Sequence, residues 1–249
     1  MANIALTTSD ITLMPHAERL AKQINIPLVE TEDSQFDYLL TLTPDYLGLI
    51  QPHLKKQKPF YLDFLSGKLQ YRSKQAGLRK ESLARAMGAK PQDQLRVIDA
   101  TAGLGRDSFI LATLGFEITL IERSPILYAL LQDALKRAGA DADIAPIIAR
   151  MHLIHANAID YLPTQTADII YLDPMFPAKQ KSAAVKKEMV ILQELLGKDP
   201  DADQLFKVAF SCACKRVVVK RSRLAPYISE LDPSFSMTGK SSRFDIYLT

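Results

Sequence analysis

The stretch Val97–Asp107 has the sequence VIDATAGLGRD and joins a short apolar run to a Gly-x-Gly turn. A stretch with helical periodicity follows the turn and stops at Gly115. The apolar run is typical of a strand. Glycines let a backbone approach a ligand closely, and a helix N-terminus offers unpaired N–H groups. The stretch therefore predicts a strand, a ligand-binding turn and a helix.

Apolar runs and helical patterns alternate from this strand to the end of the chain. We expect strands at residues 95–100, 117–122, 152–155, 168–172, 216–220 and 244–248, and helices at 107–114, 125–138, 182–196 and 203–212. This alternation is typical of βαβ units and of a mostly parallel sheet. The sequence therefore predicts an α/β, Rossmann-like domain over residues 91–249.

Residues 1–90 have a more mixed pattern. Short β-like runs at 3–6, 38–43 and 60–64 lie between polar turns, and a helical pattern at 82–87 stops at Gly88. We expect a smaller N-terminal α+β region here, which could face RNA.

The composition excludes several classes of protein. The chain has 249 residues, of which 47% are hydrophobic, and its net charge is only +3. Two cysteines, Cys212 and Cys214, are too few for a disulfide framework or a four-thiolate zinc site, and we expect both in the core. The four histidines have no metal-ligand spacing, so we expect no metal. Without a signal peptide or an apolar run of about 18 residues, we expect a soluble cytoplasmic protein and no membrane partner.

Two acidic residues near the glycine turn bear on the ligand. Glu122 ends the second predicted strand, where a carboxylate can accept the hydroxyl protons of a ribose. Asp107 begins the helix, where it would repel a pyrophosphate but suits a ligand with positive charge. The third glycine of the dinucleotide fingerprint is replaced by Ser108. These residues favour S-adenosylmethionine over a dinucleotide, although a plain strand–helix turn with a surface Glu would also fit.

Asn157 and Ala158 follow the third predicted strand. In this architecture Asn157 could bind the adenine amino edge and Ala158 could donate its backbone N–H. Asn157 is equally suited to capping the next helix.

The fourth predicted strand ends in Asp173-Pro174-Met175-Phe176-Pro177. An Asp-Pro pair before an aromatic residue resembles the motif of methyltransferases that act on exocyclic amino groups. Asp173 and the carbonyl of Pro174 could each accept an N–H of a guanine amino group, and Phe176 could stack on the base. Proline-rich turns are common at strand ends, so this motif gains weight from the glycine turn in the same chain.

Several basic clusters could contact phosphate, although charge runs are more often solvated faces. The candidates for RNA binding are Arg72, Lys74, Arg79, Lys179, Lys181, Lys220 and Arg221. Some of them flank the Asp-Pro motif or lie near the ends of predicted strands, where cations would orient a phosphate backbone.

Together these strings resemble the ribosomal RNA small-subunit methyltransferase J family. The resemblance rests on 99–107 (DATAGLGRD), 120–123 (LIER), 171–177 (YLDPMFP), 179–183 (KQKSA), 185–189 (VKKEM), 215–221 (KRVVVKR) and 243–247 (RFDIY). It implies a class I S-adenosylmethionine-dependent fold and N2-methylation of a guanosine near the 3′ end of 16S rRNA, with the rRNA or the small ribosomal subunit as partner. It also adds Arg106 and Arg123 to the cofactor contacts.

The predicted site follows from both lines of reasoning. The catalytic residues are Asp173, Pro174 and Phe176, and the cofactor-binding residues are Asp99, Gly103, Gly105, Arg106, Asp107, Glu122, Arg123, Asn157, Ala158 and Asp173. Two alternatives stay open at this point: a nicotinamide-dependent, NAD(P)-using oxidoreductase and a non-catalytic RNA-binding assembly factor.

Overall fold

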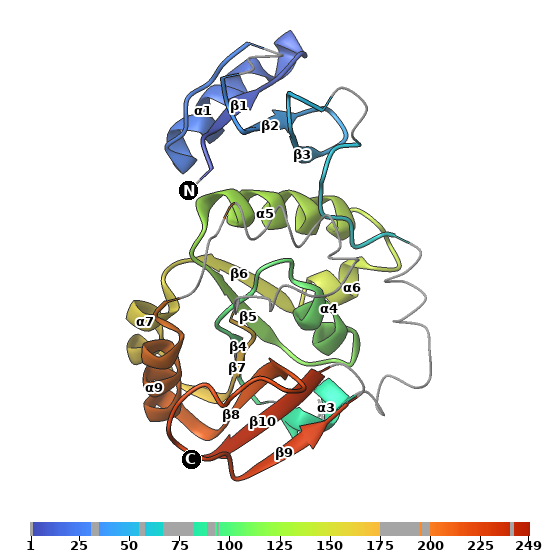
Figure 1. The fold of residues 1–249 in the computed structure, drawn as a ribbon. Coiled ribbons are helices and arrows are strands. Elements are labelled where there is room, and N and C mark those ends of the chain that lie inside the picture. The colour runs from blue at the N-terminus through green and yellow to red at the C-terminus, as the bar shows by residue number, and fades with distance from the viewer. Residues whose placement is uncertain are drawn as a thin grey trace.

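The chain contains two sheets, which a computed structural model describes over residues 2–30, 35–54, 58–66, 82–88, 93, 95–174, 195, 200–239 and 242–249. The smaller sheet has the strand order β1-β2-β3, and the larger has the order β6-β5-β4-β7-β8-β10-β9 (Figure 1). Helix α5 lies between them.

The larger sheet confirms the predicted α/β fold. Its strands are β4 (Val97–Asp99), β5 (Ile118–Glu122), β6 (Met151–His155), β7 (Ala167–Leu172), β8 (Ala213–Ser222), β9 (Phe235–Thr238) and β10 (Ser242–Leu248). Strands β6, β5, β4, β7 and β8 are parallel, and β10 and β9 add an antiparallel edge. The chain runs outward from β4 to β6 and returns to β7, so the strand order reverses between β4 and β7. Ligands of open parallel sheets bind at such a switch point, beyond the carboxyl ends of the strands.

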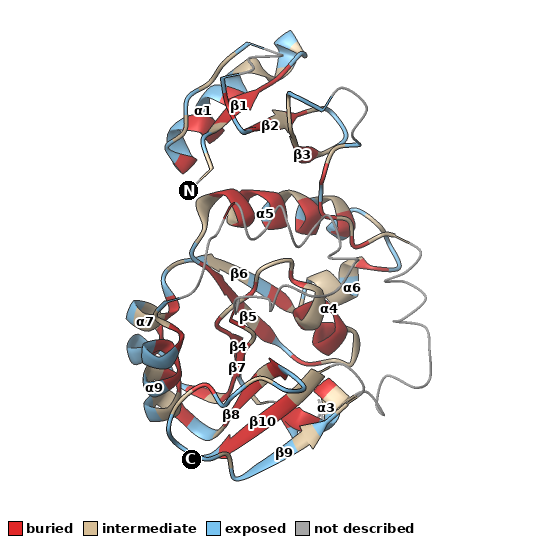
Figure 2. Cartoon of the chain, in the orientation of Figure 1, coloured by how far each residue is buried: buried red, intermediate tan, exposed pale blue. Residues whose placement is uncertain are grey.

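Helices cover both faces of this sheet. They are α3 (Ser82–Met87), α4 (Arg106–Thr113), α5 (Pro125–Gly139), α6 (Ala145–Ile148), α7 (Ala158–Tyr161), the short 3-10 helix η4 (Leu162–Thr164) and α9 (Ala202–Cys212). One core joins α4 and α5 to the sheet through residues such as Leu111 and Leu130, and another joins α9 to the opposite face through Phe206. Figure 2 shows the central strands buried and α9 exposed on its outer side.

The N-terminal region is a small α+β unit that rests on α5. It consists of β1 (Ile4–Thr7), the 3-10 helix η1 (Ile11–Leu13), α1 (Met14–Ile24), β2 (Tyr38–Leu42) and β3 (Leu47–Ile50). The Leu47 N–H donates to Asp133 Oδ2 on α5 at 3.1 Å, and the Arg137 guanidinium donates to the Leu62 carbonyl. Because α5 has neighbours on two sides, it is buried around much of its circumference.

The boundary predicted at residue 90 stays a prediction. Helix α3 precedes that boundary but packs against β10 of the larger sheet.

Two sequence predictions differ from the structure. Residues 60–64 form no strand; only an isolated bridge pairs Phe60 with Leu49, and Phe64 is buried by stacking on Phe109 at 5.1 Å. The apolar residues there pack in the core and do not form a continuous ladder with a neighbouring strand. Cys212 is half-buried and Cys214 exposed, so the expectation that both lie in the core is wrong. The predicted helix at 182–196 lies almost entirely outside the described residues.

No described helix is long and apolar enough to cross a membrane.

Candidate active site

The turn between β4 and α4 needs its two glycines. Gly103 has φ of +53° and Gly105 has φ of +67°, a region that other residues adopt only with strain. A Cβ atom on Gly105 would also lie 2.8 Å from Leu131 Cδ1. The turn therefore brings its backbone close to the core of α5, and α4 begins directly after it.

Asp99 organises this turn from the end of β4. Its carboxylate accepts the Thr101 N–H at 3.1 Å and the Ser108 hydroxyl at 2.6 Å, and its side chain is buried. Burial raises the pKa of Asp99 to about 7, against the opposing effect of the Ser108 hydrogen bond. The cofactor role predicted for Asp99 stays a prediction.

Glu122 ties the neighbouring strand to the same turn. Its Oε2 accepts the Gly103 N–H at 2.9 Å, and its Oε1 accepts the Ser124 N–H at 2.7 Å. Each carboxylate oxygen has a second lone pair, so these bonds leave acceptor capacity for ribose hydroxyls. Glu122 therefore fits a nucleoside and also anchors the turn that would bind it.

Asp107 and Asp173 meet at one ammonium group. Lys220 Nζ on β8 donates to Asp107 Oδ2 at 2.6 Å and to Asp173 Oδ2 at 2.8 Å. The buried Tyr171 hydroxyl donates to Asp107 Oδ2 at 2.6 Å. The Asp173 N–H donates to Thr101 Oγ1 at 2.6 Å, which joins the end of β7 to the glycine turn.

The charges in this group shift the pKa values of Asp173 and Lys220. Burial raises the pKa of Asp173, and the Lys220 ammonium opposes that rise most strongly. Burial also disfavours the charge on Lys220, but Asp173 and Asp107 outweigh it, so the pKa of Lys220 is raised above its ordinary value. Lys220 therefore stays protonated at neutral pH.

The carboxylates at the carboxyl ends of the strands fit S-adenosylmethionine. Glu122, Asp107 and Asp173 place carboxylates at this edge, near the cations Lys220, Arg106 and Arg123, and a carboxylate suits a ligand group with positive charge. The sulfonium and amino groups of S-adenosylmethionine carry such charge. Glu122 suits its ribose, and Asp107 lies beside the turn. Among the described residues, no group of three or more His, Cys, Asp or Glu could hold a metal ion.

The remaining predicted cofactor residues lie around this edge. Asn157 caps α7, because its Oδ1 accepts the Ile159 N–H at 3.0 Å, and Ala158 begins that helix in a buried position. Arg106 is the first residue of α4. Arg123 follows β5, and its Nη1 lies 2.7 Å from Asp201 Oδ2 before α9.

The predicted catalytic and RNA-binding residues are only partly described. Pro174 is buried next to Asp173. Phe176 lies outside the described residues, as do Arg72, Lys74, Arg79, Lys179 and Lys181. Lys220 and Arg221 are placed with internal partners instead of at a phosphate surface. Arg221 is buried, and its guanidinium donates to the Pro226 carbonyl at 2.6 Å. The RNA-binding role of both residues stays a prediction.

Sequence reasoning missed Thr101, Ser108 and Tyr171. Thr101 and Ser108 lie in the quoted turn, but only their bonds to Asp173 and Asp99 reveal a role. Tyr171 precedes the Asp-Pro pair, and the strand pattern gives it only a core position.

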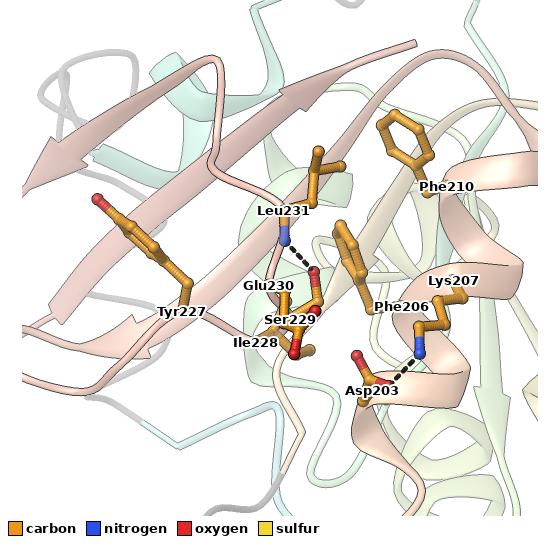
Figure 3. A pocket seen from close by; sticks show the side chains of 9 residues that line it. All are labelled: Asp203, Phe206, Lys207, Phe210, Tyr227, Ile228, Ser229, Glu230 and Leu231. Atoms are coloured by element: carbon orange, nitrogen blue, oxygen red, sulfur yellow. Dashed lines mark hydrogen bonds and ion pairs between the residues drawn. The ribbon is translucent and has the colours of Figure 1, made fainter.

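A hollow of about 600 Å³ lies elsewhere, between α9 and the loop at residues 227–231. Figure 3 shows Phe206 and Phe210 coming from the helix, and Tyr227 and Leu231 from the loop. None of the predicted catalytic or cofactor residues lines it, so it is not part of this site.

Comparisons with known proteins show the family to which the chain belongs. Residues 19–249 match the family described as "Putative SAM-dependent methyltransferase", in which SAM is S-adenosylmethionine. The protein named ribosomal RNA small subunit methyltransferase J from Thioalkalivibrio sulfidiphilus is 45% identical over 99% of this chain and 98% of the relative. The protein of the same name from Aeromonas hydrophila is 48% identical over 94% of this chain and 93% of the relative. The crystal structure of a SAM-dependent methyltransferase from Neisseria gonorrhoeae matches 98% of this chain and 95% of that chain, with 33% identity and a TM-score of 0.76.

Proposed function

The chain belongs to the ribosomal RNA small subunit methyltransferase J family of S-adenosylmethionine-dependent enzymes, and on that premise we propose that it methylates the exocyclic N2 of a guanosine near the 3′ end of 16S rRNA. The observation that carries the target atom is Asp173. Its carboxylate follows a buried strand, and its backbone N–H is tied to the glycine turn through Thr101. Cofactor and acceptor would therefore meet at one edge of the sheet.

The chemistry requires an amino group to be aimed at a methyl donor. When bound, S-adenosylmethionine supplies an electrophilic methyl group. The amino nitrogen of guanine is conjugated with its ring and is a weak nucleophile. The Asp173 carboxylate accepts one of its N–H groups, and the Pro174 carbonyl accepts the other. Positioning of this kind is worth about 7–11 kcal/mol in well-oriented systems, so alignment supplies much of the rate.

The acceptor nitrogen must then lose a proton. Asp173 is the ionisable group nearest to that nitrogen in this arrangement, and it takes the proton or passes it to water. Lys220 stays charged and is not the proton acceptor.

We propose that the partner is 16S rRNA or the small ribosomal subunit, as the names of the relatives support. That substrate is assembled in the cytoplasm, where we expect the enzyme to act. The oxidoreductase alternative is not favoured, because the chain belongs to a methyltransferase family.

The test is nucleoside mass spectrometry. The protein is incubated with S-adenosylmethionine and unmodified small ribosomal subunits, and the digested rRNA is searched for N2-methylguanosine. The Asp173→Asn variant keeps the size of the side chain but loses its charge. We expect it to lose about 10²–10⁴-fold in rate. Asp168→Asn, at the start of β7 away from the site, is the matched control.

A different methylated nucleoside would overturn the target atom but leave the fold and cofactor in place. Full activity of Asp173→Asn would overturn the mechanism.

A further inference from the structure

We propose that Lys220 is a positioning residue for methyl transfer, which holds the Asp173 carboxylate ionised and oriented toward the acceptor amino group. This inference rests on the proposed function and extends it to a residue on β8, outside the Asp-Pro motif and the glycine turn. The sequence pattern associates Lys220 with RNA, whereas its ammonium bonds to two carboxylates of the site.

The first argument is geometric. Lys220 Nζ bridges Asp107 Oδ2 at 2.6 Å and Asp173 Oδ2 at 2.8 Å, and its side chain is only 28% exposed. Both contacts have the length of charge-assisted hydrogen bonds. A surface lysine that served phosphate would lie free in solvent, so this placement points to an internal role.

The second argument concerns the charge that would remain without Lys220. Asp107 and Asp173 would then lie near each other without a cation between them, and the charge of Asp107 acts to raise the pKa of Asp173. The Lys220 ammonium is the charge that opposes this rise most strongly. Without it, the pKa of Asp173 would therefore rise further.

A protonated Asp173 would lose its function. The carboxyl would become a donor on one oxygen, and it could no longer accept the N–H of an amino group there or take up a proton after transfer. Lys220 thus sets the protonation state on which the acceptor step depends, without itself touching the acceptor.

The ionisation of Asp173 depends on groups from four elements around it. They are Asp107 on α4, Asp99 on β4, Tyr171 on β7, and Lys220 and Arg221 on β8. Asp107, Asp99 and burial favour the neutral form of Asp173, whereas Lys220 and Arg221 favour the ionised form. Lys220 is the cation that donates directly to its carboxylate.

The experiment compares Lys220→Met, Lys220→Gln and Lys220→Arg with the wild-type enzyme. Methyl transfer to small ribosomal subunits is measured as kcat/KM from acidic to alkaline pH. An opposite charge at this distance lowers a carboxyl pKa by about 1–3 units. We therefore expect the acidic limb of the two neutral variants to move to higher pH by about 1–3 units, which lowers the rate by about tenfold or more below that limb.

Two comparisons separate this role from a structural one. Lys220→Arg keeps the charge, so its acidic limb should lie close to that of the wild type. Lys215→Met removes a lysine from the opposite end of the same strand, where Nζ lies 3.8 Å from Asp168, and should leave the profile unchanged. A loss of activity that is equal at every pH in Lys220→Met and Lys220→Gln would overturn the proposal, as would an unshifted limb.

A second readout does not depend on turnover. The Asp173 carboxyl carbon is titrated by NMR in wild type and in Lys220→Gln, with Asp173→Asn used to assign the signal. We expect the pKa of Asp173 to rise in the variant, and an unchanged pKa would overturn the proposal. Product formation by the wild type tests the proposed function, whereas this titration tests Lys220 alone.

Discussion

Glu122→Gln is the substitution that most directly tests how the cofactor turn is held. In the wild type, the two carboxylate oxygens accept the N–H groups of Gly103 at 2.9 Å and Ser124 at 2.7 Å. The residue is 6% exposed, so water cannot readily replace either bond. Glutamine has nearly the same shape, which makes the change in hydrogen bonding the main difference.

The expected magnitude follows from counting donors. The glutamine carbonyl can accept one of the two backbone N–H groups, but its NH₂ group then faces the other, donor against donor. One charge-assisted hydrogen bond is lost, worth about 1.5–3 kcal/mol. We expect the free energy of unfolding to fall by about that amount. Cofactor affinity should also fall by about 10–100-fold, because an ionised acceptor for the ribose hydroxyls is lost.

The assay is urea unfolding together with calorimetric binding of S-adenosylhomocysteine. Glu117→Gln is the matched control, since Glu117 precedes the same strand and its side chain is 64% exposed. We expect the control to stay within about 0.5 kcal/mol of wild type. If Glu122→Gln also stays within that range and binds the cofactor product normally, Glu122 does not hold the turn and the reasoning fails.

Three further changes test other parts of the fold. The pKa of Asp99 is raised from 3.8 to about 7, so the folded state binds this proton more tightly and the free energy of unfolding falls as the pH rises between these values. In the Asp99→Asn variant, urea unfolding at a series of pH values should not show this fall. Gly105→Ala should lower the free energy of unfolding by about 1–2 kcal/mol because of its positive φ, and by more because its Cβ would meet Leu131 on α5. The control, Gly139→Ala, should not destabilise the protein. Asp133→Ala should speed hydrogen exchange at the Leu47 amide, and unchanged exchange would show that this bond does not hold β3 on α5.

Much of the larger sheet could be predicted because local patterns carry it. The apolar runs that predict β4, β5 and β7 coincide with observed strands, and the helical patterns after them coincide with α4 and α5. Parallel strands buried on both faces require such runs, and glycines in left-handed turns can be recognised directly.

The N-terminal region was less predictable. Strand β3 is short and contains Gly48, and the run at 60–64 has strand composition without strand pairing. Each depends on contacts with α5 or with the core beneath α4, which no local pattern contains.

The candidate site divides in the same way. The sequence alone determined the class of fold, the glycine turn, and the acids at the ends of the strands, because each depends on residue types at short spacing. Only the tertiary structure decided which partners those acids have. Glu122 accepts the backbone N–H of Gly103 in the turn, Asp99 accepts the Ser108 hydroxyl, and Asp173 accepts a hydrogen bond from Lys220. Residues 107, 173 and 220 are far apart in the chain, and the pKa values of Asp173 and Lys220 depend on the other members of the group. The parallel sheet brings them within hydrogen-bonding distance, and Lys220 is part of the site because of that proximity.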